Sequence, residues 1–158
     1  MKRHQYNIKT TWTGNLGVGT SDYKAYDRSH VVSIEGKTDI LGTSDPAFRG
    51  DKTKHTPEDL FVSTLSTCHM LWYLHLCAVN NVVVTEYIDK ATGVMEEDQT
   101  GRGHFTKVVL KPEVTVAKTS MIDKANELHR DAHEMCFIAN SINFPVVHEP
   151  SVIVAQPA

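Results

Sequence analysis

A chain of 158 residues, 41% of them hydrophobic and 22% charged, is long enough to bury a core, and we expect one domain spanning residues 1–158. The net charge of −3 and the lack of a long basic run argue against nucleic acid as a partner. The basic start, Met1 to Tyr6, leads into polar residues and not into an apolar segment. This argues against a signal peptide and favours a cytoplasmic protein.

The hydrophobic pattern predicts strands, a long helix, a pair of strands, a second helix and a final strand, in that order. Strands are expected at residues 6–13, 29–35 (with a short partner at 23–26), 82–96, 104–117 and 146–154, and helices at residues 57–78 and 120–139. Pro112 and Pro150 interrupt two of the strands, because proline cannot donate to a strand ladder. Residues 36–55 form a long polar connection, which in a compact domain is usually functional or disordered. The order of elements predicts an α+β fold with antiparallel sheet packed on helices.

The first helix is the feature around which the chain is organised. Thr56 is a suitable N-cap, Pro57 suits the first helical position, and Asp59 completes a capping box. The residues that follow are apolar nearly all the way round, as in a helix that is buried in a core or crosses a membrane. Several serine, threonine and histidine side chains within it favour the buried core, and no membrane partner is expected.

Three cysteines without a secretory signal indicate a reducing compartment, where thiols are catalytic, metal-binding or inert. Cys68 and Cys77 are nine residues apart in one helix, so they lie on opposite faces, about 13 Å apart along its axis, and cannot bond to each other. Cys77, between Leu76 and Ala78, is expected to pack in the core. Cys136, near the end of the second helix, could reach either of the other two, and the sequence leaves both pairings open.

Cys68 stands in the middle of the helix, and a buried cysteine is inert unless a neighbour stabilises its thiolate. Candidate cations are Arg49 in the long connection, His69 and His133. Glu58, an acid at the helix start, could hold the arginine in orientation. Without such a neighbour, Cys68 would be a small hydrophobic residue and nothing more.

A zinc site is the alternative for some of these residues. His129, His133 and Cys136 fall at i, i+4 and i+7 on one helix face, and Cys68 could complete a set of four ligands. The sequence lacks the paired-cysteine spacing of a zinc finger. Histidines on a half-buried helix face are therefore favoured, and no metal or other cofactor is expected.

Two stretches around the cysteines resemble the motifs of the OsmC/Ohr family, the osmotically inducible and organic hydroperoxide resistance proteins. The first is residues 56–61 (TPEDLF) followed by residues 65–70 (LSTCHM), in which Cys68 follows Glu58 by ten residues, as in the family's central helix. The second is the Ala132-His133 pair three residues before Cys136. The order of elements also fits, so the resemblance covers nearly the whole chain. Residues 45–50 (DPAFRG) and 68–75 (CHMLWYLH) look closest to an OsmC-like subgroup.

The resemblance implies an intertwined homodimer whose antiparallel sheets wrap around the long central helix and the second helix. It implies a thiol peroxidase that reduces organic hydroperoxides and uses no metal or prosthetic group. By this analogy Cys68 is peroxidatic and becomes a sulfenic acid, Cys136 condenses with it to a disulfide, and an external dithiol restores both. Arg49 would lower the pKa of the Cys68 thiol and polarise the peroxide, and Glu58 would orient Arg49.

Two departures from the family pattern stand near these residues. Phe137 follows Cys136, where the family usually has proline. The position of the family's arginine varies, which makes Arg28 a second candidate beside Arg49.

Helix geometry adds an inference about assembly. Ten helical residues separate Glu58 from Cys68 by about 15 Å along the axis, a gap that one arginine cannot easily span. If Glu58, Arg49 and Cys68 share a site, we expect Glu58 and Arg49 to come from a second subunit whose helix runs antiparallel to the first. The active site would then lie at a two-fold interface.

Two other functions fit the same residues. A binding protein could hold a lipid-like ligand, without turnover, in an apolar pocket beside Cys68 lined by Met70, Trp72, Phe137 and Phe144. The chain could also be a zinc-binding or purely structural dimer.

Overall fold

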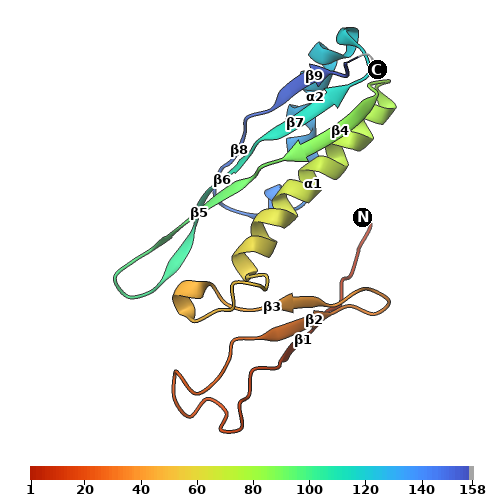
Figure 1. Ribbon diagram of the computed structural model, residues 1–158. Helices are drawn as coiled ribbons and strands as arrows, with labels where there is room; N and C mark the ends of the chain where they lie inside the picture. The colour runs from red at the N-terminus through yellow and green to blue at the C-terminus, as the bar shows by residue number, and fades with distance from the viewer. Residues whose placement is uncertain (157–158) are drawn as a thin grey trace. The chain divides into compact units, whose positions relative to one another are not determined.

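The computed structural model describes residues 1–156 and divides into two compact units, which we call the first unit (residues 1–61) and the second unit (from residue 62 onward) (Figure 1). The long helix α1 (Pro57–Val79) begins in the first unit and continues through the second. The prediction of one domain over residues 1–158 stays a prediction.

The first unit is built on an antiparallel sheet of three short strands, in the order β1-β2-β3. Its strands are β1 (Lys9–Trp12), β2 (His30–Ser33) and β3 (Ile40–Gly42). The first two fall inside predicted strands, whereas β3 lies in the connection that was predicted to be mostly irregular, and residues 23–26 form turns in place of the predicted short strand. A three-residue strand is too short for alternation to reveal it. The 3-10 helix η1 (Pro46–Phe48) follows β3.

Helix α1 begins where its capping residues predicted and ends one residue beyond the predicted range. The backbone N–H of Thr56 donates to Asp59 Oδ2 at 3.0 Å, and the backbone N–H of Asp59 donates to Thr56 Oγ1 at 3.1 Å, which forms the reciprocal capping box. At the other end Asn81 adopts a left-handed conformation with φ 58°, and the N–H of Val82 donates to the carbonyl of Cys77 at 2.9 Å. None of the helices in the described chain is long and apolar enough to cross a membrane.

The second unit contains two three-stranded sheets, in the orders β4-β7-β9 and β5-β6-β8. Their strands are β4 (Val84–Asp89), β5 (Thr92–Glu97), β6 (Gly103–Leu110), β7 (Pro112–Val116), β8 (Val146–His148) and β9 (Ser151–Val154). Pro112 and Pro150 mark breaks as predicted, while the strand predicted over residues 82–96 is divided between β4 and β5.

The sheets are mixed, where the sequence predicted antiparallel pairing. β4 pairs with β7 and β5 with β6 in antiparallel fashion, but β9 runs parallel to β7 and β8 runs parallel to β6. The reason is the second helix, α2 (Ile122–Met135), which connects β7 to the last two strands as a crossover and lets the chain return in the same direction.

Helix α2 is shorter than predicted at both ends. The 3-10 helix η2 (Thr119–Met121) leads into it, and it ends at Met135 because Cys136 adopts an extended conformation with φ −68° and ψ 109°. A further 3-10 helix, η3 (Ala139–Ser141), follows. Cys136 therefore lies just beyond the helix and not within it.

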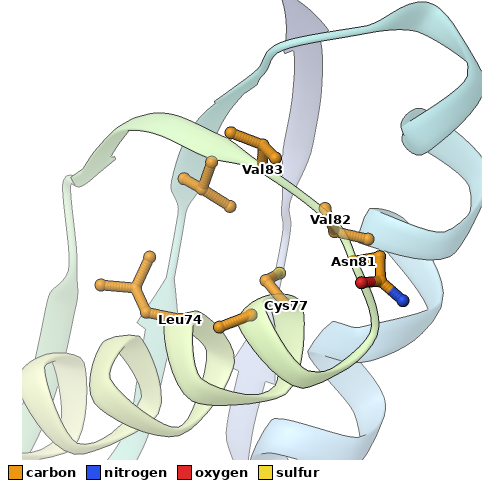
Figure 2. A pocket seen from close by; sticks show the side chains of 7 residues that line it. Leu74, Cys77, Asn81, Val82 and Val83 are labelled. Atoms are coloured by element: carbon orange, nitrogen blue, oxygen red, sulfur yellow. The ribbon is translucent and has the colours of Figure 1, made fainter.

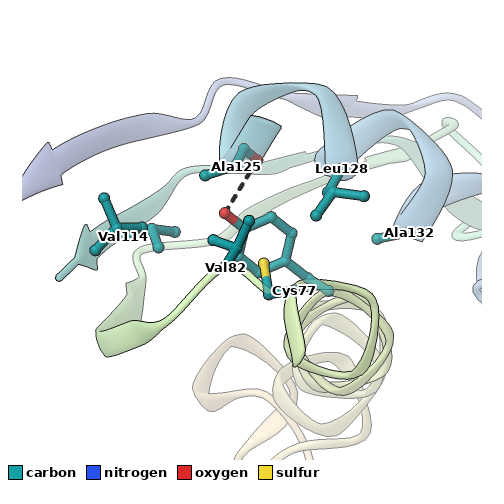
Figure 3. Packing of buried hydrophobic residues seen from close by; sticks show 8 residues of the cluster. Cys77, Val82, Val114, Ala125, Leu128 and Ala132 are labelled. Atoms are coloured by element: carbon teal, nitrogen blue, oxygen red, sulfur yellow. Dashed lines mark hydrogen bonds between the residues drawn. The ribbon is translucent and has the colours of Figure 1, made fainter. Parts of the chain in front are cut away.

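The core of the second unit lies between α1, α2 and the β4-β7-β9 sheet (Figure 3). It comprises Tyr73, Cys77, Val82, Val114, Val116, Ala125, Leu128 and Ala132. The Tyr73 hydroxyl donates to the Ala125 carbonyl at 3.0 Å and so joins the two helices inside this core. Cys77 is core packing, as predicted.

Burial of α1 is confined to one face of the helix. Its fully buried residues, Leu65, His69, Tyr73 and Cys77, recur every fourth position. On the opposite face Leu71 is 64% exposed, so the all-round burial predicted from the apolar sequence is not found in a single chain.

Candidate active site

The structure brings two of the predicted site residues, Cys68 and Cys136, into side-chain contact. Cys68 is half-buried on α1 and Cys136 is 1% exposed just after α2, and the Cys68 side chain lies near enough to Cys136 to raise the pKa of its thiol. All three cysteines are free thiols. Of the two pairings left open by the sequence, the geometry thus favours Cys68 with Cys136, since Cys77 lies in the core.

The surroundings of Cys136 keep it protonated. Burial raises the pKa of the Cys136 thiol, and the nearby Cys68 side chain raises it further, to about 11. The backbone N–H of Ala139 donates to the Cys136 sulfur at 3.4 Å, which opposes this rise with a smaller effect. A thiol with so high a pKa holds its proton at neutral pH and can donate it toward the sulfur of Cys68.

An apolar pocket with a volume of about 410 Å³ opens beside Cys68. Its lining consists of Thr64, Thr67, Cys68, Leu71, Trp72, Phe137 and Ile138. The rings of Trp72 and Phe137 meet edge to face with centroids 5.5 Å apart, which ties the segment after α2 to α1. Trp72 and Phe137 were predicted to line this pocket; Met70 and Phe144, which were also predicted, are not among its lining residues.

A second pocket, of about 430 Å³, lies where α1 gives way to β4 and includes Cys77 in its wall (Figure 2). The Cys77 side chain is only 1% exposed, and burial raises the pKa of its thiol. A protonated, buried thiol is a poor nucleophile, so this pocket is a weaker candidate for thiol chemistry than the pocket at Cys68.

The other two predicted site residues, Arg49 and Glu58, lie in the first unit. Arg49 follows η1 with a left-handed backbone (φ 67°) and an exposed side chain, and Glu58 is half-buried in the first turn of α1. Within residues 1–156, neither side chain forms an ion pair, with the other or with any third residue. The predicted Arg49–Glu58 pair is therefore not formed inside one chain.

Arg28, the second candidate for the activating arginine, is held within its own loop. Its guanidinium donates to the carbonyls of Tyr26 and Tyr23, at 2.5 and 2.7 Å. It also lies over both tyrosine rings, 4.0 Å from the centroid of Tyr26 and 4.5 Å from that of Tyr23. These contacts give Arg28 a structural role in the first unit.

The sequence matches the model of the OsmC-like protein family over residues 50–151, which include Cys68, Cys136 and Glu58. The chain belongs to the OsmC-like family. No curated protein matches it.

Solved structures of other family members share the fold. An OsmC-like protein of unknown function from Vibrio cholerae is 32% identical, with a TM-score of 0.85, over 94% of this chain and 100% of that chain. An OsmC-like protein from Mycoplasma pneumoniae is 11% identical, with a TM-score of 0.72, over 96% of this chain and 99% of that one. An organic hydroperoxide resistance protein from Elizabethkingia anophelis is 16% identical, with a TM-score of 0.63, over 99% of this chain and 100% of that one.

This OsmC-like protein also contains a cluster of histidines that the sequence did not reveal. His69, which was predicted as a cation for Cys68, instead makes a hydrogen bond to His129 at 3.1 Å between ring nitrogens. Burial lowers the pKa of His69 to about 3, so its ring is neutral at physiological pH and cannot stabilise a thiolate by charge. The i, i+4 spacing of His129 and His133 was a visible signal, but nothing in the sequence marked His148, whose ring contacts both His69 and His133.

The zinc set considered for Cys68, His129, His133 and Cys136 has no counterpart in the geometry. In the part of the chain that the structure describes, no group of three or more histidine, cysteine or acidic side chains is arranged to hold a metal ion. His129 faces His69, and Cys136 faces Cys68.

Proposed function

We propose that this OsmC-like protein is a thiol peroxidase that reduces organic hydroperoxides to alcohols. The observation that supports it best is the contact between a half-buried Cys68, at the wall of an open apolar pocket, and a buried Cys136 whose pKa is raised to about 11. The two thiols differ in the way that a two-cysteine peroxidase needs. One is accessible to substrate, and the other holds a proton until it is required.

The reaction follows from these positions. The Cys68 thiolate attacks the outer oxygen of the hydroperoxide, the O–O bond breaks, and the alkoxide takes a proton and leaves as the alcohol. Cys68 is then a sulfenic acid. The Cys136 sulfur attacks the Cys68 sulfur, and the hydroxyl of the sulfenic acid leaves as water with the Cys136 proton. An external dithiol reduces the disulfide and is itself oxidised.

The apolar walls of the pocket support a substrate with a hydrocarbon portion. Leu71, Trp72, Phe137 and Ile138 offer contact to an alkyl or aryl chain while its peroxide end lies at Cys68. Hydrogen peroxide could not use these contacts. We therefore expect bulky organic hydroperoxides to be preferred over it.

We also propose that the working form is a homodimer to which Arg49 and Glu58 contribute from the second copy. Leu71 is 64% exposed beside Cys68, and this apolar surface supports contact with a second copy. Arg49 and Glu58, which would both come from that copy, form no ion pair with each other in one chain, so this pair would form only on assembly. Arg49 would lower the pKa of the Cys68 thiol, and Glu58 would orient Arg49. The site would then be complete only when two chains meet.

The test is an assay of cumene hydroperoxide consumption with a dithiol, comparing the three cysteine variants. Cys68→Ser should lower the rate more than about a thousandfold, because the nucleophile is lost. Cys136→Ser should retain the first turnover and accumulate a sulfenic acid at Cys68, which dimedone labels. Cys77→Ser is the matched control on the opposite face of α1 and should keep full turnover per folded molecule.

Two outcomes would contradict the mechanism. Peroxidase activity that survives in Cys68→Ser would exclude Cys68 as the nucleophile. A sulfenic acid trapped at Cys136 in the Cys68→Ser variant, with turnover preserved, would reverse the two roles.

A second candidate, binding of an apolar ligand without turnover, is favoured by the pocket alone, since its walls are mostly apolar. In that case a fatty acid should quench the fluorescence of Trp72 equally in the wild type and in Cys68→Ser, and cumene hydroperoxide should not be consumed. A Trp12→Phe background removes the only other tryptophan.

A further inference from the structure

Four histidines from three elements form a stack in the second unit. His69 comes from α1, His129 and His133 from α2, and His148 from β8. Beyond the hydrogen bond between His69 and His129, ring centroids are 4.5 Å apart for His69 and His148, and 4.6 Å apart for His133 and His148. We call these four residues the histidine stack.

His69 and His129 are buried, His133 and His148 are half-buried, and the stack is incompletely hydrogen-bonded. His69 is 1% exposed and His129 is 3% exposed. In residues 1–156, the buried side-chain nitrogens and oxygens without a hydrogen-bond partner are the Nδ1 atoms of His69 and His133, the Nε2 atoms of His129 and His148, and the hydroxyl of Tyr87. Four of these five atoms belong to the stack, so its rings are held mainly by packing.

The groups that face the stack offer no compensating negative charge. On α1, Tyr73 stacks on His129 with centroids 3.9 Å apart, and on β4 Tyr87 lies 5.8 Å from Tyr73. Burial raises the pKa of both tyrosines, so both are neutral. Among the described residues, the charges that act on His69, His129 and His148 are those of other histidines in the stack, and no carboxylate or further cation contributes. A proton that enters the stack therefore meets repulsion and no counter-ion.

We propose that the histidine stack is an acid-sensitive lock that packs α1 against α2 and β8 at neutral pH and that loses stability as the pH falls below about 6.5, while the rings of the folded chain stay neutral. This proposal concerns the stability of the fold and does not depend on the proposed peroxidase activity. Because α1 carries Cys68 and α2 leads directly to Cys136, weakening of the lock would loosen the thiol pair in acid.

The direction of the effect follows from the burial of the rings. Burial, followed by repulsion from the other histidines, lowers the pKa from 6.5 to about 3 for His69 and to about 4 for His129 and His148. A histidine whose pKa is lower in the folded state than in the unfolded state contributes its full stability above pH 6.5. That contribution is lost as the pH falls from about 6.5 toward about 4, since the unfolded chain takes up protons that the folded chain excludes.

The test measures the unfolding equilibrium constant by urea denaturation of the intact chain at several pH values from 7.5 to 5. Each of His69, His129 and His148 should raise this constant about tenfold for each pH unit below 6.5. His148→Phe keeps a ring in place and removes one titrating group. The slope of the logarithm of its unfolding constant against falling pH should therefore be smaller than that of the wild type, by about one logarithmic unit per pH unit. His75→Phe, an exposed position on α1, is the matched control and should leave the slope unchanged.

A second measurement needs no variant. In the wild type, the Cε1–H resonances of His69, His129 and His148 should not shift between pH 7.5 and 5. Titration of His69 and His129 near 6.5 would overturn the proposal, as would an unfolding slope that His148→Phe leaves unchanged. Neither readout uses peroxidase activity, so failure of the lock is distinguishable from failure of the proposed reaction.

Discussion

The two units differ in how they are stabilised. Every buried hydrophobic side chain in residues 1–156 belongs to the second unit, in which α1, α2 and the strands enclose a core. In the first unit all four residues of β1 are exposed, and its large exposed apolar residues include Tyr6 (87%), Leu16 (70%) and Ile8 (64%). A three-stranded sheet without a covered face has little stability of its own in water.

This difference indicates where a second chain would bind. The second unit has a complete core but leaves the apolar residues around Cys68 uncovered, whereas the first unit carries Arg49 and Glu58 on a poorly buried frame. Contiguous apolar surface of this kind usually marks an interaction site. The proposed homodimer would cover the apolar face of α1 and supply the charged residues in one step.

The largest effect should come from a charge placed on the uncovered face of α1. Leu71→Glu should weaken the dimer by at least about a hundredfold, because a carboxylate without a partner would be buried in the interface. Sedimentation equilibrium measures the dissociation constant. Hydrogen exchange should show faster exchange in β1, β2 and β3 of the variant, with the core of the second unit still protected.

The control for this variant is Ile153→Glu on β9. Ile153 is 62% exposed, close to the 64% of Leu71, but it lies on a strand and not on α1. It should leave the dissociation constant within about threefold of the wild type. A dimer of unchanged affinity in Leu71→Glu would show that this face of α1 is not the interface.

A smaller effect is expected in the first unit, at Arg49. Arg49 and Asn81 are the non-glycine residues with positive φ in the described chain, at 67° and 58°. Strained backbone of this kind is often kept at functional sites. Arg49→Gly should lower peroxidase activity at least about tenfold, through loss of the cation, while stability stays equal or rises by up to about 1 kcal/mol as the strain is relieved.

Asn81→Gly provides the comparison, because it relieves a similar backbone at the end of α1 without removing the cation that we propose acts on Cys68. Urea denaturation and the cumene hydroperoxide assay should show unchanged activity for Asn81→Gly. Full activity in Arg49→Gly would exclude Arg49 from the mechanism. Another group would then have to lower the pKa of the Cys68 thiol.

Local signals in the sequence were enough for much of the fold. The cap at Thr56 and the apolar run after it placed α1 within a residue or two, because a helix start depends on hydrogen bonds between near neighbours. The motifs around Cys68 and Cys136 indicated the family, and the family model covers both.

Features that depend on distant residues were missed. The parallel pairing of β8 with β6 and of β9 with β7 depends on the crossover through α2. His148 joined the stack because β8 lies beside the two helices, a position that no local pattern encodes. The sequence therefore predicted His69 as a charged neighbour of Cys68, whereas tertiary packing makes it a neutral part of the core.

The smallest predicted change is in the free energy of unfolding of two tyrosine variants, which test how polar groups contribute to the core of the second unit. The Tyr73 hydroxyl donates to the carbonyl of Ala125, whereas the buried Tyr87 hydroxyl has no partner in the described chain. Tyr73→Phe should therefore lower the free energy of unfolding by about 1 kcal/mol, which is the net contribution of one buried hydrogen bond. Tyr87→Phe removes the same atom without breaking a bond and should leave stability equal or slightly higher, since a desolvated hydroxyl is lost. Urea midpoints at pH 7.5 compare the two, and equal losses would mean that Tyr87 finds a partner when the protein is in solution.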